Sequence, residues 1–248
     1  GIELGMAARL HVLGAQELDL QLKGCEGHPT LAASFRAQIG QAVTLEKAIG
    51  IYTSRDTAHP AQTVQQYIDA QPDYSTLRRQ HEAAWAKLWE DCDVVVEGDL
   101  TSQIAIRYNL FQLLISAPRN DDRVSIGAKT LSGFGYRGHV FWDTEIFILP
   151  VLTYTQPQLA RNLLTYRYHT LPGARRKAHG YGYPGAVYAW ESAATGDEVT
   201  PRWVLPNSQG GEPIRIWCGD RELHITTDVA YAIWHYWQAT QDDEWMQA

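Results

Sequence analysis

The sequence has few of the residues that mark several large classes of protein. Its 248 residues include only three cysteines, Cys25, Cys92 and Cys218, which are too far apart to form a metal-ligand pair and cannot all be bridged. We therefore expect a reducing, cytoplasmic setting. The longest apolar run, residues 146–152, is far too short to span a bilayer. The 21 Lys and Arg residues form no basic block and face 28 Asp and Glu, which argues against nucleic acid and membranes as partners.

The start of the chain, "GIELGMAARL", has neither a signal-peptide pattern nor an initiator methionine. We expect both ends to be cuts in a longer protein. The composition, 45% hydrophobic and 20% charged, suits an ordinary folded core.

Aromatic residues are the unusual part of the composition. Nine Trp and thirteen Tyr stand against five Phe. Trp and Tyr offer a flat apolar face with a polar group, which suits sugar rings and wet interfaces, although such residues also fill helix-packing cores.

The pattern along the chain changes near Thr57. Before it, "ELDLQLKG" and "AVTLEKAIGIYTS" alternate between apolar and polar residues and predict strands of an antiparallel sheet. After it, helical spacing predicts helices over residues 74–92, 100–117, 156–171 and 226–240, with Ser75 as a cap of the first. Apolar stripes are expected at Leu77, His81, Ala84 and Leu88; at Ile104, Tyr108, Phe111 and Ile115; and at Val229, Ile233, Tyr236 and Trp237. Glycine-rich loops at 131–139, 179–186 and 207–213 separate helices, which favours an α/α toroid over βαβ alternation.

The stretch "YRGHVFWDTE", residues 136–145, concentrates a histidine, a tryptophan and two carboxylates at the start of an apolar run. One interpretation is structural: glycines 133, 135 and 138 permit tight turns, and Asp143 or Thr144 caps the following helix. A second is a metal site of His139, Asp143 and Glu145, but Glu145 would point away and no second ligand cluster exists. A third is a sugar site, in which an aromatic face covers the ring and carboxylates accept hydroxyl protons.

Four segments together resemble glycoside hydrolase family 65, the inverting α-glucoside phosphorylases for maltose, trehalose, kojibiose and nigerose with a few hydrolases. They are "AKTLSGFGYRGHVFWDTEIFILPVL", "PQLARNLLTYRYHTLPGARRKA", "GAVYAWESAATGDEVTP" and "GDRELHITTDVAYAIWHYWQAT". The resemblance covers nearly the whole chain, and "GHVFWDTE" is its most specific part.

This resemblance implies a mainly α fold: an incomplete (α/α)6 barrel preceded by the last strands of an antiparallel β-sandwich and a helical linker. Residues 1–55 would be the end of the sandwich, 56–98 the linker, and 99–248 the first part of the barrel. Such a truncated barrel exposes apolar stripes, so either a homodimer or association with the missing remainder of the barrel is expected.

The resemblance also implies the residues of the glucose pocket. Trp142 and Asp143 match the family's pair that holds the non-reducing glucose. The neighbouring and motif-matched residues expected to line the cleft are Tyr136, Arg137, His139, Glu145, Trp190, Glu191, Glu222 and His224. For Trp190 and Trp203 a packing role carries equal weight, and Glu222 could serve as a helix-start carboxylate. No metal or other cofactor is implied.

In such an enzyme, phosphate attacks the anomeric carbon while one protonated carboxyl group donates its proton to the leaving oxygen, and the product is β-glucose 1-phosphate. The family's acid lies in a later "DEY"-type motif, so we expect the acid beyond Ala248 and none within this chain, with Glu222 as the fallback.

Ala189, Cys218 and Gln241 depart from the family pattern at supporting positions. The alternatives are an inverting α-glucoside hydrolase and a non-catalytic glucose-binding fragment; the wording of the last segment favours the kojibiose branch.

Overall fold

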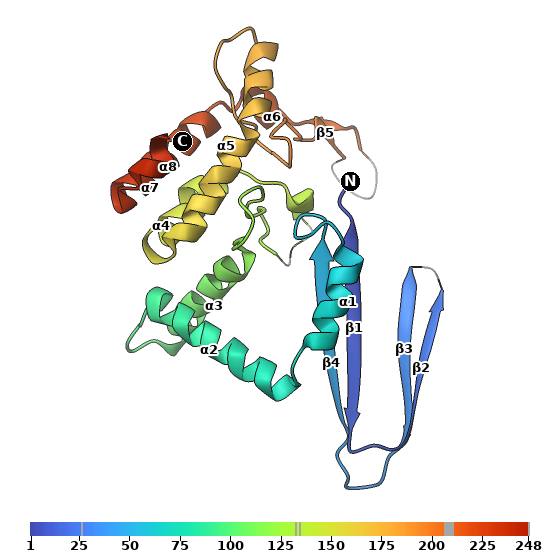
Figure 1. Ribbon diagram of the computed structural model, residues 1–248. Helices are drawn as coiled ribbons and strands as arrows, with labels where there is room; N and C mark the ends of the chain where they lie inside the picture. Colours follow the sequence, from blue (N-terminus) through green and yellow to red (C-terminus); the bar gives the residue numbers. More distant parts are fainter. Residues whose placement is uncertain (26, 132, 134, 206–210, 248) are drawn as a thin grey trace. The chain divides into compact units, whose positions relative to one another are not determined.

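The computed structural model describes residues 1–25, 27–131, 133, 135–205 and 211–247 (Figure 1). Residues 207–210 of the third expected glycine-rich loop, and residues 132 and 134 of the first, lie outside this part of the chain. The chain divides into two compact units, Gly1–Lys87 and Leu88–Ala248, which are described separately. Over the described residues, no helix has the length and apolar character needed to cross a membrane.

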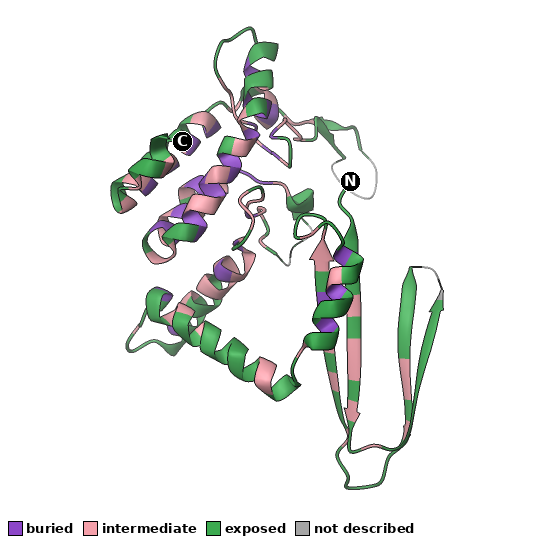
Figure 2. Cartoon of the chain, in the orientation of Figure 1, coloured by how far each residue is buried: buried purple, intermediate pink, exposed green. Residues whose placement is uncertain are grey.

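The first unit contains the predicted antiparallel strands. β1 (Leu4–Leu13) pairs with β4 (Thr44–Thr53), and β2 (Gln16–Cys25) pairs with β3 (His28–Arg36), each pair antiparallel. α1 (Pro60–Ala70) lies across β1 and β4 and buries Val64 and Ile68 (Figure 2). Glycine is required beneath it, because a Cβ on Gly5 would come within 2.5 Å of the Pro60 backbone.

α2 (Tyr74–Cys92) matches the predicted helix, but two details of the prediction were wrong. The cap is Asp73, not Ser75: the Asp73 carboxylate accepts hydrogen bonds from the Thr76 N–H and the Ser75 hydroxyl. The expected apolar stripe is not buried either, since Cys92 is the only buried residue of this helix. Periodicity identifies residues that share a helix face, but it does not supply a neighbour for that face.

The second unit is mainly helical. Its longer elements are α3 (Leu100–Ser116), α4 (Leu149–Thr155), α5 (Pro157–Gly180) and α7 (Ile225–Thr240). Short elements lie between and after them: the turn η1 (Gly135–Gly138), the π-helical turn η2 (Thr144–Ile148), the strands β5 (Trp203–Val204) and β6 (Ile214–Arg215), and the helices α6 (Cys218–Arg221) and α8 (Asp243–Gln247). A strand-rich unit followed by a helical unit agrees with the coarse fold prediction.

α5 is the central helix of this unit, and it packs against α4 and α7. It begins at Pro157, next to the predicted start at residue 156, but the predicted end at residue 171 was wrong, because the helix continues to Gly180. Proline interrupts a helix only by removing one N–H and crowding one carbonyl. Here the surrounding contacts keep the helix intact, and Gly173 and Ala174 are buried within it.

The other helices correct further details of the predicted apolar stripes. On α3, Ile104 and Tyr108 are each 60% exposed, whereas Leu114 is buried. On α7, Val229 and Tyr236 are buried as expected, but Ala232 takes the place given to Ile233, and His224 occupies the cap position without a side-chain capping bond.

Gln241 ends α7 in the left-handed region, with φ 53°. That is the conformation which favours glycine, and it explains why glycine suits this position.

Gly173 provides a direct test of the packing around α5. A Cβ at this position would lie 2.3 Å from the backbone carbon of Gly196, and a backbone atom cannot move aside as a side chain can. Gly173→Ala should therefore lower the free energy of unfolding by about 1–3 kcal/mol, measured by urea denaturation followed by circular dichroism.

The matched control is Gly180→Ala at the end of the same helix, where an added Cβ meets nothing within 4 Å. This change should be neutral or stabilising by up to ~1 kcal/mol. Equal losses in the two variants would contradict the packing described here.

Candidate functional site

Three of the residues predicted to bind sugar come together at one point of the second unit. The ring of His224 meets Trp142 edge-on, with centroids 4.9 Å apart, and meets Trp190 at 5.9 Å. The two indole rings lie 6.3 Å from each other. Trp142 and Trp190 are partly exposed, so this aromatic trio is not sealed inside a core.

The segment before Trp142 reaches the trio through an unusual backbone. Tyr136, Arg137 and Gly138 are three successive left-handed residues, with φ 57°, 54° and 76°. Non-glycine residues adopt this region rarely and at an energetic cost, so their presence marks a turn that its surroundings enforce. The Tyr136 ring then packs edge-on against Phe141 with centroids 5.0 Å apart, while Arg137 is exposed.

The segment after Trp142 is a helical turn that the Asp143 carboxylate does not cap. The next five residues form the π-helical turn η2, a feature that often occurs at functional sites. Neither residue expected to cap this helix does so: Asp143 makes no side-chain capping bond, and the Thr144 hydroxyl donates to the Ile126 carbonyl. Within the described part of the chain, no hydrogen bond or ion pair involves the Asp143 carboxylate.

A second segment, residues 190–192, lies beside the first. Val140 and Ser192 exchange two backbone hydrogen bonds of 2.9 and 3.0 Å. Next to this bridge, the His139 Nδ1 atom lies 2.9 Å from the buried Glu191 carboxylate. The bridge therefore aligns two of the predicted motifs, "GHVFWDTE" and "WES", as one wall.

Glu145 lies behind this wall rather than on its surface. Its carboxylate accepts two hydrogen bonds of 2.7 Å from Arg167, and both side chains are fully buried. Arg167 also donates to the Phe141 carbonyl and the Ser192 hydroxyl, so one guanidinium group holds both wall segments. Burial is the largest single influence on the pKa of Arg167 and lowers it, but the charge of Glu145 and its hydrogen bonds to the guanidinium group together outweigh burial and hold that pKa above its usual value.

Sequence reasoning missed two residues that support the site, Arg167 and Glu198. The signal for Arg167 was present: the spacing of Leu163, Arg167, Thr170 and Ala174 places an arginine on the buried face of a helix. Glu198 accepts hydrogen bonds from the backbone N–H groups of both Trp190 and Glu191. No periodic pattern marks Glu198, because it lies in a loop.

Glu222 and His224 follow α6 and are both partly exposed. The His224 Nε2 atom lies 3.8 Å from Glu222, while its Nδ1 atom lies 2.5 Å from Asp228 one helical turn later. Asp228 thus orients the His224 ring toward the two indoles.

Trp203, on β5, is 59% exposed, and the Arg215 guanidinium group lies over one face of its ring.

The residues considered as metal ligands have different partners. His139 contacts Glu191, and Glu145 is bound to Arg167. Among the described residues, Asp143 has no hydrogen bond or ion pair with either His139 or Glu145. Across the described residues, no group of three or more His, Cys, Asp or Glu side chains has an arrangement suited to a metal ion.

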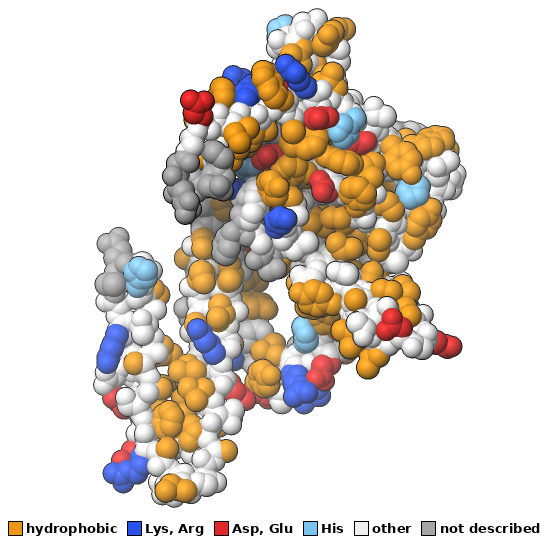
Figure 3. Space-filling view, turned by 180° about the vertical axis from the view of Figure 1, so that it is seen from behind, with side chains coloured by type: hydrophobic (Ala, Val, Ile, Leu, Met, Phe, Trp, Pro, Cys, Tyr) orange, Lys and Arg blue, Asp and Glu red, His pale blue; other side chains and the backbone are white. Residues whose placement is uncertain are grey.

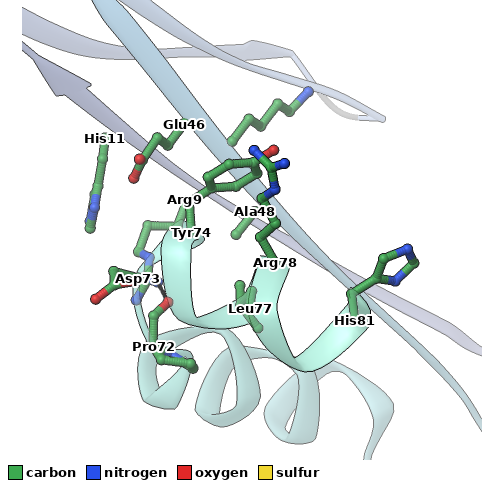
Figure 4. Close-up of a pocket in the computed structure, with 11 residues that line it drawn as sticks. Arg9, His11, Glu46, Ala48, Pro72, Asp73, Tyr74, Leu77, Arg78 and His81 are labelled. Atoms are coloured by element: carbon green, nitrogen blue, oxygen red, sulfur yellow. Dashed lines mark hydrogen bonds between the residues drawn. The ribbon is translucent and has the colours of Figure 1, made fainter. Parts of the chain in front are cut away.

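A separate hollow of about 320 Å³ lies in the first unit, between the sheet and the start of α2 (Figure 4). Most of its charged side chains already have partners in that unit. Arg9 donates to the Gln71 and Pro72 carbonyls, Asp73 caps α2, and Arg78 pairs with Glu82. This hollow offers a ligand few free groups, so the aromatic trio is the better candidate site.

Two models of known protein families match different parts of the chain. Residues 1–88 match the N-terminal domain of glycosyl hydrolase family 65, and residues 107–248 match its central catalytic domain. The boundary between the two matches lies close to the division between the two compact units. The three-part division at residues 55 and 98 stays a prediction.

Three curated relatives are informative. A kojibiose phosphorylase of Halothermothrix orenii is 44% identical over 95% of this chain and 32% of its own length. A 1,2-alpha-glucosylglycerol phosphorylase of Bacillus selenitireducens is 38% identical over 86% of this chain and 28% of its own. A nigerose phosphorylase of Lachnoclostridium phytofermentans is 36% identical over 84% of this chain and 28% of its own. The chain therefore spans about a third of the length of these relatives.

A solved structure titled "Putative kojibiose phosphorylase from human microbiome" shares the fold. It superposes with a TM-score of 0.76 at 21% sequence identity, covering 98% of this chain and 31% of that one.

The buried ion pair behind the wall yields a stability prediction. Arg167→Met leaves the Glu145 carboxylate buried without a partner, so the free energy of unfolding should fall by about 3–5 kcal/mol in urea denaturation followed by tryptophan fluorescence. The control is Arg176→Met on the same helix, which removes an exposed pair with Asp197. Exposed pairs of this kind contribute about 0–1 kcal/mol. A loss below 1 kcal/mol for Arg167→Met would contradict the role assigned to the pair.

Proposed function

Because the chain belongs to glycosyl hydrolase family 65, we propose that it supplies the glucose-binding wall of an inverting α-glucoside phosphorylase of the kojibiose type. The substrates would be an α-linked glucose disaccharide and inorganic phosphate, and no further cofactor is required. The observation that carries this proposal is the juxtaposition of Trp142, Trp190 and His224 next to Asp143, whose carboxylate has no hydrogen-bond or ion-pair partner among the residues that the structure describes.

This juxtaposition suits a pyranose ring. The C–H face of the sugar packs on an indole, and a carboxylate accepts protons from neighbouring hydroxyl groups in charge-assisted hydrogen bonds. Asp143 and Trp142 would be the primary contacts. Tyr136, Arg137, Glu222 and His224 would shape the rim, while Glu145, His139 and Glu191 would support the wall through their own partners.

The reaction needs one acid and an incoming phosphate. A phosphate oxygen attacks the anomeric carbon from the face opposite the leaving oxygen, and a protonated carboxyl group transfers its proton to that leaving oxygen. The bond that forms gives β-glucose 1-phosphate, and the bond that breaks releases the second sugar. We propose that this acid comes from outside residues 1–248, since Asp143 is assigned to the hydroxyl groups and Glu222 lies beside His224 on the rim.

The helices of the second unit would form the first part of an (α/α)6 barrel. Figure 3 shows hydrophobic side chains on the surface of this unit. The exposed ones that support the proposal include Phe147, Tyr154, Tyr231 and Trp234. These are the side chains that further barrel helices, or a second subunit, would cover.

Glucose binding tests the assigned pocket. In titrations followed by tryptophan fluorescence, Asp143→Ala should weaken glucose binding at least about tenfold, because hydrogen bonds to a charged group contribute ~1.5–3 kcal/mol. Asp69→Asn, which removes an exposed carboxylate in the first unit, is the control and should bind as the parent chain does. Unchanged affinity in Asp143→Ala would remove this residue from the pocket.

The reaction itself is tested by anomer-resolved NMR of the chain with kojibiose, trehalose and maltose, with and without phosphate. We expect glucose binding without turnover, because the acid is not among residues 1–248. Phosphate-dependent β-glucose 1-phosphate would instead assign the acid to this chain, and Glu222→Gln would then be expected to abolish turnover. Phosphate-independent release of β-glucose would identify a hydrolase.

A further inference from the structure

We infer that Glu198, together with Lys177, is a positioning clamp that sets the Trp190–Glu191 edge of the glucose subsite. The inference deepens the proposed function and rests on it. Lys177 and Glu198 lie in two of the segments that resemble the family, residues 157–178 and 185–201, but neither was among the residues predicted to line the pocket.

The Glu198 carboxylate gathers donors from three segments of the chain. Its Oε2 atom accepts the Trp190 N–H at 2.9 Å and the Lys177 ammonium at 2.5 Å. Its Oε1 atom accepts the Glu191 N–H at 3.2 Å and the Thr200 hydroxyl at 2.6 Å. The two oxygens thereby bind two successive backbone amides of the wall, one each.

Only an ionised carboxylate satisfies this arrangement. Each of its two oxygens accepts more than one hydrogen bond, whereas a glutamine has one acceptor oxygen and an NH₂ group that would face donors. The Lys177 ammonium reinforces the carboxylate: its side chain is only 8% exposed, and a charge at that depth needs a partner. Lys177 and Glu198 therefore depend on each other.

The clamp acts on the sugar site through the backbone. Fixing the Trp190 amide sets the position from which its indole reaches Trp142 and His224. Fixing the Glu191 amide places its carboxylate 2.9 Å from His139. Lys177 lies on α5, the same helix as Arg167, which holds the adjacent Ser192. One helix thus holds the whole 190–192 segment through two charged side chains.

A sugar site benefits from such preorganisation. A binding wall that is already ordered loses less conformational freedom when the ligand arrives, and a loosened wall lowers affinity without a lost direct contact. Glu198 touches no sugar in this account, so it is a positioning residue and not a catalytic one.

The test compares Glu198→Gln with Asp197→Asn, its neighbour, whose exposed carboxylate pairs with Arg176. The Trp190 indole N–H resonance is assigned by its absence in Trp190→Phe. Glu198→Gln should shift this resonance and weaken glucose binding about tenfold, the equivalent of one lost charge-assisted hydrogen bond, while the far-ultraviolet circular dichroism is retained. Asp197→Asn should change neither the resonance nor the affinity.

Thr200→Val is the milder second variant, because it removes one donor to Glu198 and leaves the charge in place. It should shift the same resonance and weaken glucose binding about twofold to threefold, and it keeps the test valid if Glu198→Gln does not fold. A folded Glu198→Gln chain with an unshifted resonance and parental affinity overturns the clamp, even if its melting temperature falls.

Failure of the proposed function is distinguishable from failure of the clamp. If the parent chain binds no glucose, the proposed function fails, and the clamp is judged by the Trp190 resonance alone. A shift in Glu198→Gln and Thr200→Val but not in Asp197→Asn then supports it, and no shift overturns it.

Discussion

The buried guanidinium group of Arg167 is the interaction on which the second unit depends. It neutralises Glu145 inside the protein and donates to the Phe141 carbonyl and the Ser192 hydroxyl. A buried charge is stable only when it is paired and its hydrogen bonds are satisfied. Because these partners belong to two segments outside α5, residues 141–145 and Ser192, satisfying Arg167 forces those segments to lie side by side.

This constraint explains how irregular segments make a defined site. The wall contains left-handed residues at 136–138 and a π-helical turn after Asp143, neither of which is stable by itself. Arg167 and Lys177, both from α5, hold the wall through Glu145, Ser192 and Glu198. The rigid helix supplies the charges, the loops supply the aromatic rings and Asp143, and the wall remains partly open to a ligand.

Local sequence patterns predict much of this arrangement. The features that they do not predict depend on contacts between distant segments. Alternation located β2 and β4, and helical spacing located α2, α3 and α7, because these patterns are local. The family motifs named residues whose rings do meet, as at Trp142 and His224. The length of α5 and the role of Glu198 depend on contacts with distant segments. Such contacts leave no periodic trace, so a helix interrupted by Pro172 was predicted to stop.

The most direct test of the account is a crystal structure of the chain with bound glucose. We expect the sugar ring to pack against Trp142, two of its hydroxyl groups to donate to Asp143, and the Arg167–Glu145 pair to be unchanged behind them. Glucose located elsewhere, or Asp143 turned away from the sugar while Trp142 packs into the interior, would contradict it.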